Sequence, residues 1–128
     1  MANIPADLKY TKSHEWVKEE DGLLVVGLTD FAATALGDIV FIRLPEAGEE
    51  VTAGESFAEV ESVKAVSDVF SPATGKVAEV NEALNDAPEA VNEDPYGAWL
   101  IKIAGTEATD ELLDASAYEA VCAAEEDA

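Results

Sequence analysis

Short runs of alternating apolar and polar residues, separated by turn residues, extend along most of the chain. Alternation with a period of two is typical of β-strands that bury one face. The Asp21-Gly22 pair between two such runs is a strong hairpin signal. The pattern predicts strands at 15–19, 23–29, 38–44, 56–62, 65–70, 76–81 and 99–103. Short strands joined by turns favour a small β sandwich or barrel.

Two segments are predicted to be helical. Asp30 can cap a short helix at 30–36, and Gly37 can end it in the left-handed conformation. Thr109 can cap a last helix at about 109–124. The expected buried stripe of this helix recurs every four positions, at Leu113, Ala117 and Val121, with Leu112, Tyr118 and Cys122 beside it. The polar connection 82–97 is expected at the surface, with a helical turn.

These elements predict one domain over residues 1–128, with its core at about 14–104 and a C-terminal α-helix. Acidic residues outnumber basic ones by 28 to 7, which gives a formal charge of −21. Such a charge opposes nucleic-acid binding, because phosphates are repelled. It also attracts partners with basic surfaces; solubility or a salty cytoplasm is the alternative explanation.

The chain has no apolar stretch long enough to cross a membrane, and its first residues lack the pattern of a secretory signal or an Arg-rich transit peptide. Cys122 is the only cysteine and has no internal disulfide partner, which fits a reducing compartment. We therefore expect a cytoplasmic protein, or one of the mitochondrial matrix if a leader has been removed.

Motifs for catalysis are absent from the sequence. His14 is the only histidine, so a zinc site is not expected. There is no G-x-S-x-G elbow and no phosphate-binding glycine loop. His14 is interpreted as a surface or hydrogen-bonding residue, and an enzyme that uses it with nearby carboxylates is kept as the alternative. The acidic run 92–94 lacks calcium-loop spacing and is interpreted as a solvated face.

Lys64 is the only basic residue between Arg43 and Lys76, and it lies in a tight turn between two predicted strands. A lysine at a hairpin tip is held by backbone pairing while its flexible stem projects into solvent. Such a lysine suits acylation, after which its stem and the acyl chain form a tether that raises the effective concentration of the cargo. The alternative is an ordinary solvated lysine in a turn.

Several segments, in this order, carry a resemblance to a known family. The chain resembles the H-protein family of the glycine cleavage system, the lipoylated carriers, over nearly its whole length. The matching segments are 10–16 (YTKSHEW), 36–41 (LGDIVF), 61–65 (ESVKA), 71–75 (SPATG), 79–81 (EVN), 84–97 and 112–115 (LLDA). The chain departs from the family at Gly97-Ala98-Trp99, where other members often have an additional residue, so the path of this loop is open.

The resemblance implies a lipoyl/biotinyl-type barrel-sandwich hybrid in which Lys64 carries lipoate in amide linkage. It also implies that Glu61 and Gly75 are recognised by the modifying enzyme, a lipoyl or octanoyl transferase or a lipoate ligase. Biotin carriers usually flank the lysine with methionines, whereas Val63 and Ala65 occupy these positions here, which favours lipoate.

The resemblance further implies a non-catalytic relay. The carrier would take an aminomethyl group from PLP-dependent glycine decarboxylase to aminomethyltransferase, and dihydrolipoyl dehydrogenase would then reoxidise the dithiol. Ser13, Glu15 and Asp68 match positions of a cleft that holds the loaded arm. We expect a monomer that binds neither nucleic acid nor membrane. The alternatives are a lipoyl donor for other complexes and a lipoyl or biotinyl carrier of another system.

Overall fold

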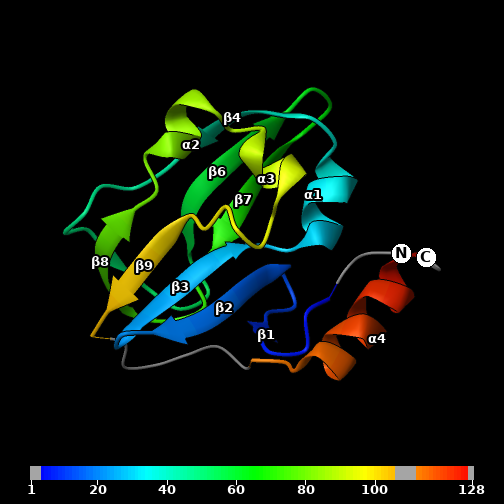
Figure 1. Cartoon of the computed structure of the whole chain (residues 1–128), viewed down its shortest axis with the longest axis horizontal. Coiled ribbons are helices and arrows are strands. Elements are labelled where there is room, and N and C mark those ends of the chain that lie inside the picture. Colours follow the sequence, from blue (N-terminus) through cyan, green and yellow to red (C-terminus); the bar gives the residue numbers. More distant parts are fainter. Residues whose placement is uncertain (1–3, 106–111, 127–128) are drawn as a thin grey trace.

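Two antiparallel sheets form the framework of the protein (Figure 1). The computed structural model describes residues 4–105 and 112–126. Its larger sheet has the order β1-β2-β3-β9-β8-β5 and its smaller sheet the order β4-β6-β7. The strands of the larger sheet are β1 Lys9–Tyr10, β2 Glu15–Glu20, β3 Leu23–Leu28, β9 Ile101–Ala104, β8 Gly75–Val80 and β5 Glu50–Val51. Those of the smaller sheet are β4 Ile39–Arg43, β6 Ser56–Ser62 and β7 Val66–Phe70. The predicted mainly β fold is confirmed.

The hairpin between β2 and β3 has the predicted turn. Glu20 pairs with Leu23, which leaves Asp21 and Gly22 as a two-residue loop. Both have positive φ, 53° and 79°, as a type I′ turn requires. This turn sets the register of the two strands, so that Trp16 lies opposite Gly27.

Helix α1 spans Asp30–Leu36, the range predicted for it, but its N-cap lies one residue earlier than expected. The Thr29 side chain accepts a hydrogen bond from the backbone N–H of Ala32, so Thr29 and not Asp30 is the N-cap. Asp30 instead lies in the first turn, where a carboxylate is favourable beside the helix dipole. Gly37 ends the helix, as predicted, with a positive φ of 78°, but its ψ of −154° lies outside the left-handed helical conformation that was expected.

The connection from β8 to β9 contains two helical turns where one was expected, α2 (Ala83–Asp86) and α3 (Ala90–Glu93). The shortened loop folds tightly onto Asp94, whose carbonyl accepts hydrogen bonds from the N–H groups of Gly97 and Ala98. Strand β9 then begins at Ile101, two residues later than predicted. No helix in the described part of the chain has the length and apolarity of a membrane span.

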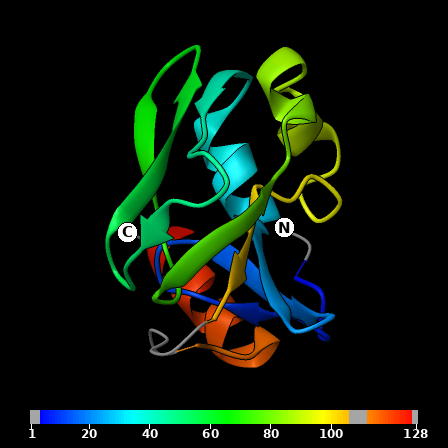
Figure 2. The same ribbon diagram turned by 90° about the vertical axis from the view of Figure 1, so that its left-hand side faces the viewer.

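The hydrophobic side chains form two clusters. The main cluster lies between the two sheets and includes Val26 of β3, Ile42 of β4, Val60 of β6 and Ile101 of β9. Figure 2 shows the smaller sheet, in green, rising along one side of the molecule to a loop beside α1. Burying several such side chains, each worth about 1.5–3 kcal/mol, is the main force that holds the sheets together.

The second cluster attaches helix α4 (Ala115–Glu126) to the N-terminal strands. The rings of Tyr10 and Tyr118 stack with their centroids 4.7 Å apart. The expected stripe is wrong in part: Tyr118 and Cys122 are the buried residues of α4, whereas Ala117 is exposed. The helix also begins at residue 115 and not near 109, since Leu113 forms a β-bridge with Tyr10. The proposed cap, at position 109, lies outside the described residues.

Gly27 provides a test of this packing. A Cβ atom at Gly27 would lie 2.5 Å from the Trp16 ring, and Trp16 is fully buried and donates from Nε1 to the carbonyl of Pro95. We expect Gly27→Ala to lower the free energy of unfolding by about 1–3 kcal/mol, the usual cost of overpacking. Urea denaturation measures it. In a Trp16→Leu background the same substitution should cost less, and an equal cost in both backgrounds would contradict the packing explanation.

Candidate functional site

Lys64 lies at the tip of the β6–β7 hairpin, as predicted. It is exposed, and the chain reverses direction over residues 63–65. The hydroxyl of Ser62 organises this turn, because it accepts hydrogen bonds from the backbone N–H groups of Lys64 (3.3 Å) and Ala65 (3.1 Å). The Ser62 N–H in turn donates to the Ala65 carbonyl at 2.8 Å. The backbone that carries Lys64 is therefore fixed from within the turn.

The tip is also held from outside, by the segment that follows α1. The Val63 N–H donates to the carbonyl of Asp38 at 3.1 Å. Asn92 of α3 fixes this segment, since its side chain accepts from Ile39 N–H (2.9 Å) and donates to the Gly37 carbonyl (2.7 Å). The Lys64 stem lies close to Gly37, with Cε 3.5 Å from the place that a Cβ on Gly37 would occupy.

The amine of Lys64 has no counter-ion within the described ranges 4–105 and 112–126. Among the residues that the structure describes, none places a carboxylate within salt-bridge distance of its Nζ. An amine without a counter-ion at an exposed and fixed tip can enter the active site of another protein and form an amide there. The site therefore fits a covalently attached acyl cofactor.

Of the two expected recognition residues, only Glu61 lies near Lys64. Glu61 is exposed near the end of β6 and pairs across the sheet with Val66. Gly75 is the first residue of β8, which follows the end of β7 that is remote from Lys64. The five residues of β7 span roughly 17 Å at about 3.3 Å per residue, so one partner would have to follow the whole hairpin to touch both Lys64 and Gly75.

Ser13 and Glu15, two of the three residues expected at the cleft for the loaded arm, are brought together, and Glu15 is fully buried. Its side chain is 0% exposed. Its Oε1 accepts from the hydroxyls of Thr11 (2.6 Å) and Ser13 (2.5 Å), and its Oε2 accepts from the N–H of Phe70 at 3.3 Å. Burial raises the pKa of the Glu15 carboxyl, and these hydrogen bonds oppose the rise. Strand β7 is an edge strand of the smaller sheet. The hydrogen bond from Phe70 to Glu15 therefore connects the free edge of β7 to the larger sheet.

Asp68 does not join this group. It is exposed, and its carboxylate accepts a hydrogen bond from the Ser56 hydroxyl at 3.3 Å. In the smaller sheet Asp68 pairs with Glu59, which forms an ion pair with Arg43 at 3.1 Å. The structure thus places Asp68 among charged residues of the outer face, whereas Ser13 and Glu15 lie at the junction of the two sheets.

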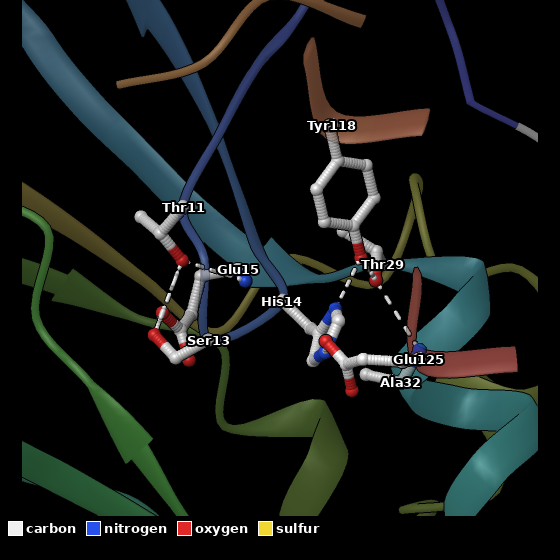
Figure 3. Close-up of polar contacts among 8 residues, drawn as sticks. All are labelled: Thr11, Ser13, His14, Glu15, Thr29, Ala32, Tyr118 and Glu125. Atoms are coloured by element: carbon white, nitrogen blue, oxygen red, sulfur yellow. Dashed lines mark hydrogen bonds and ion pairs between the residues drawn. The ribbon is translucent and has the colours of Figure 1, made fainter. Parts of the chain in front are cut away.

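His14 points away from its neighbours Ser13 and Glu15 and belongs to a second network (Figure 3). Its Nδ1 lies 2.7 Å from the Tyr118 hydroxyl, and its Nε2 lies 2.8 Å from a carboxylate oxygen of Glu125. The Tyr118 hydroxyl also lies 2.7 Å from that of Thr29, the N-cap of α1. The predicted hydrogen-bonding role of His14 is confirmed.

This network anchors α4 to the loop before β2, and sequence reasoning did not find it. Burial raises the pKa of Tyr118, so its hydroxyl keeps its proton in the physiological range. The backbone of His14 has a φ of 74°, uncommon for a residue other than glycine, and the network holds it there. In the described part of the chain, no group of three or more His, Cys, Asp or Glu side chains is placed to hold a metal ion.

Comparisons with known proteins agree on one family. A family model described as "Glycine cleavage H-protein" matches residues 8–125. The chain is 59% identical over 121 residues to the "Glycine cleavage system H protein" of Burkholderia cenocepacia strain HI2424, covering 92% of this chain and 96% of that one. It is 54% identical over 131 aligned positions to the protein of the same name from Chromohalobacter salexigens, covering 99% and 100%. A crystal structure of a glycine cleavage system H protein from Mycobacterium marinum superposes with a TM-score of 0.86 at 49% identity, covering 91% of this chain and 97% of that one.

The buried Glu15 carboxyl makes a prediction about pH. Because its pKa is raised on folding above its ordinary value of 4.5, Glu15 contributes stability below that value and loses it as the pH rises through the folded pKa. Glu15→Gln removes this titration and keeps the shape of the side chain. We therefore expect the free energy of unfolding of the variant, minus that of the wild type, to increase from pH 4 towards neutral pH. Urea denaturation at several pH values measures the difference, and a difference independent of pH would contradict a raised pKa.

Proposed function

Because this chain belongs to the glycine cleavage H-protein family and is a lipoyl carrier of the glycine cleavage system, we propose that Lys64 carries the lipoate, in amide linkage through Nζ. The observation that carries this proposal is the exposed amine of Lys64 at a turn fixed by Ser62 and by the Asp38 carbonyl. Other lysines of the chain lack this setting; Lys76, for example, lies within β8.

The chain itself presents and tethers the cofactor. To form the amide, the ammonium of Lys64 would lose a proton to the attaching enzyme, and the free amine would attack the carbonyl carbon of an activated acyl donor. The bond from that carbon to the donor's leaving group then breaks, and the nitrogen gives up a second proton and becomes a neutral amide. Lipoate, when attached, supplies a disulfide that can be reduced and can carry a one-carbon unit on sulfur. The hairpin fixes one end of the arm, and the freely rotating lysine stem lets the other end visit several enzymes at high effective concentration.

Glycine decarboxylase, aminomethyltransferase and dihydrolipoyl dehydrogenase are the enzymes that the arm would serve, and the chain itself would catalyse none of their reactions. The formal charge of −21 supports this relay, because a strongly acidic carrier associates faster with basic enzyme surfaces. We expect the carrier to act as a monomer, since copies of such charge repel one another.

We further assign Ser13 and Glu15 to holding the loaded arm. A loaded arm ends in an amine, and a cationic donor makes a stronger hydrogen bond to a carboxylate than a hydroxyl does. Ser13 is exposed and contacts Glu15 Oε1, so it marks the side from which the amine would approach. The raised pKa of Glu15 falls again when a cation lies beside it, which favours the charged pair. Asp68, bonded to Ser56 on the outer face, remains a prediction from the family resemblance.

Lys64→Arg tests the attachment. We expect wild-type protein from a lipoate-sufficient host to show a lipoyl mass increment on the peptide that contains Lys64, and the variant to show none, because a guanidinium does not form the amide. Intact-protein and peptide mass spectrometry measure it. Lys76→Arg is the matched control and should keep the increment. A Lys64→Arg protein that still supports glycine-dependent bicarbonate exchange would exclude Lys64 as the carrier residue.

Glu15→Gln tests how the arm is held. The variant keeps an acceptor for the Phe70 N–H but loses its charge, so a cationic amine is bound more weakly. We expect the aminomethyl group to leave loaded carrier about ten to a hundred times faster, as loss of a hydrogen bond to a charged group of about 1.5–3 kcal/mol implies. Release of formaldehyde and ammonia measures the rate. Asp68→Asn is the comparison: faster release from that variant alone would transfer the role to Asp68.

A further inference from the structure

The exposed large apolar side chains gather around Lys64. In the described residues these are Val40, Phe41, Val63 and Val66, with 50%, 52%, 69% and 63% of their surfaces exposed. All four lie in the β4-β6-β7 sheet or its hairpin turn, at the end that carries Lys64. Isolated exposed apolar residues are ordinary, whereas a group on one face marks an interaction site.

The strand register places two of these side chains, Phe41 and Val66, on one face. Phe41 pairs with Glu61, and Glu61 pairs with Val66, so the three form one row across the sheet. Directly opposite residues point to the same side of a sheet, and the next row points to the other side. In that next row Ile42 and Val60 are buried in the main cluster, which places Phe41, Glu61 and Val66 on the outer face.

A β-bulge enlarges this apolar row. The register between β4 and β6 shifts between Ile39 and Phe41, so Val40 has no paired residue. Ile39 and Ile42 are buried, while Val40 and Phe41, consecutive in sequence, are both exposed. Bulges re-aim side chains in this way and are frequent beside functional sites. The core gains nothing from two large apolar groups in water, so their placement points to a partner.

We propose that the outer face formed by Val40, Phe41, Glu61, Val63 and Val66, here called the tip face, is the docking surface for the enzyme that acylates Lys64. This inference rests on Lys64 being the attachment residue. The acylating enzyme must bring its reaction centre to Nζ itself, so contact with the tip is unavoidable. Enzymes that act on the far end of a long arm meet their substrate away from the tip and have no such need.

The charges on this face define the chemistry of the partner. Glu61 lies between Phe41 and Val66 and forms no ion pair with any residue that the structure describes. Two rows further along, in the next row of the same face, Arg43 is already neutralised by Glu59 at 3.1 Å. A partner complementary to this face therefore presents an apolar surface and one cationic side chain that lies opposite Glu61. A second copy of this chain does not fit, because two chains of charge −21 repel each other.

The test uses full-length apo protein with a purified lipoate-attaching enzyme from a host that lipoylates this chain. The variants are Phe41→Thr/Val66→Thr, which keeps β-propensity but removes the apolar row, and Glu61→Gln. We expect each to raise the dissociation constant for the attaching enzyme, measured by titration calorimetry, and to lower kcat/KM for lipoylation about tenfold, mainly through KM, the size expected for a few central contacts. Phe41→Leu and Glu50→Gln, an exposed strand acid of β5, should behave like the wild type.

Several results would overturn the proposal. Because the substituted residues are exposed, the melting temperature should stay unchanged, which shows that the double variant is folded. Normal lipoylation of this variant and normal affinity for the attaching enzyme would then exclude the tip face as the docking surface. If only the reactions of the glycine cleavage enzymes with lipoylated variants are impaired, the face belongs to one of those enzymes. Dimerisation in sedimentation that the variants abolish would assign it to a second copy. A wild-type protein lipoylated elsewhere than Lys64 would instead contradict the proposed function.

Discussion

The hydroxyl of Ser62 is the interaction on which the presentation of Lys64 depends. One oxygen accepts from two successive backbone N–H groups, those of Lys64 and Ala65, and so closes the turn in a single conformation. A free turn of this length would lose on the order of 1–2 kcal/mol per residue in backbone entropy whenever a partner ordered it. The turn is therefore ordered in advance, and only the lysine stem keeps its freedom. Stiff backbone with a mobile side chain is what a carrier needs.

The fold extends this order outward from the turn. The Asp38 carbonyl and the Asn92 side chain connect the tip to the segment after α1 and to α3. At the other end of β7, Glu15 connects the edge of the smaller sheet to the larger one. A buried carboxyl in this place is costly in its charged form, and three hydrogen bonds reduce the cost. The residue that would hold the loaded arm is thus also a structural link between the sheets.

Local signals in the sequence predicted the features that local interactions decide. Asp21-Gly22 set a hairpin because both residues tolerate positive φ, and Gly37 ended a helix for the same reason. The alternation of polar and apolar residues around Lys64 predicted its hairpin, and the family resemblance added its chemistry. Thr29 and Asp30 are neighbours whose side chains can both cap a helix, so propensity could not distinguish them. In the structure Thr29 is the N-cap.

Features decided by distant residues were not predictable. Strands β1 and β5 have two residues each, too few for a periodic signal, and exist because longer strands pair with them. The buried side of α4 follows from the stacking of Tyr118 on Tyr10, not from its spacing alone. Likewise, the family resemblance singled out Glu15, but its burial could not be predicted, because only the assembled sheets enclose it. The bulge that exposes Val40 also left no mark in the sequence pattern.

The contact between α4 and the N-terminal strands has a consequence for synthesis. His14 and Tyr118 are 104 positions apart, and α4, which carries Tyr118, follows all the other described elements in the chain. Contacts of such separation form late, since most of the chain must exist before they can close. Until α4 has been synthesised, the nascent chain therefore exposes the faces of Tyr10 and Trp16 that α4 and its neighbours later cover. A chain that stops short of this helix would leave them exposed to chaperones and to aggregation.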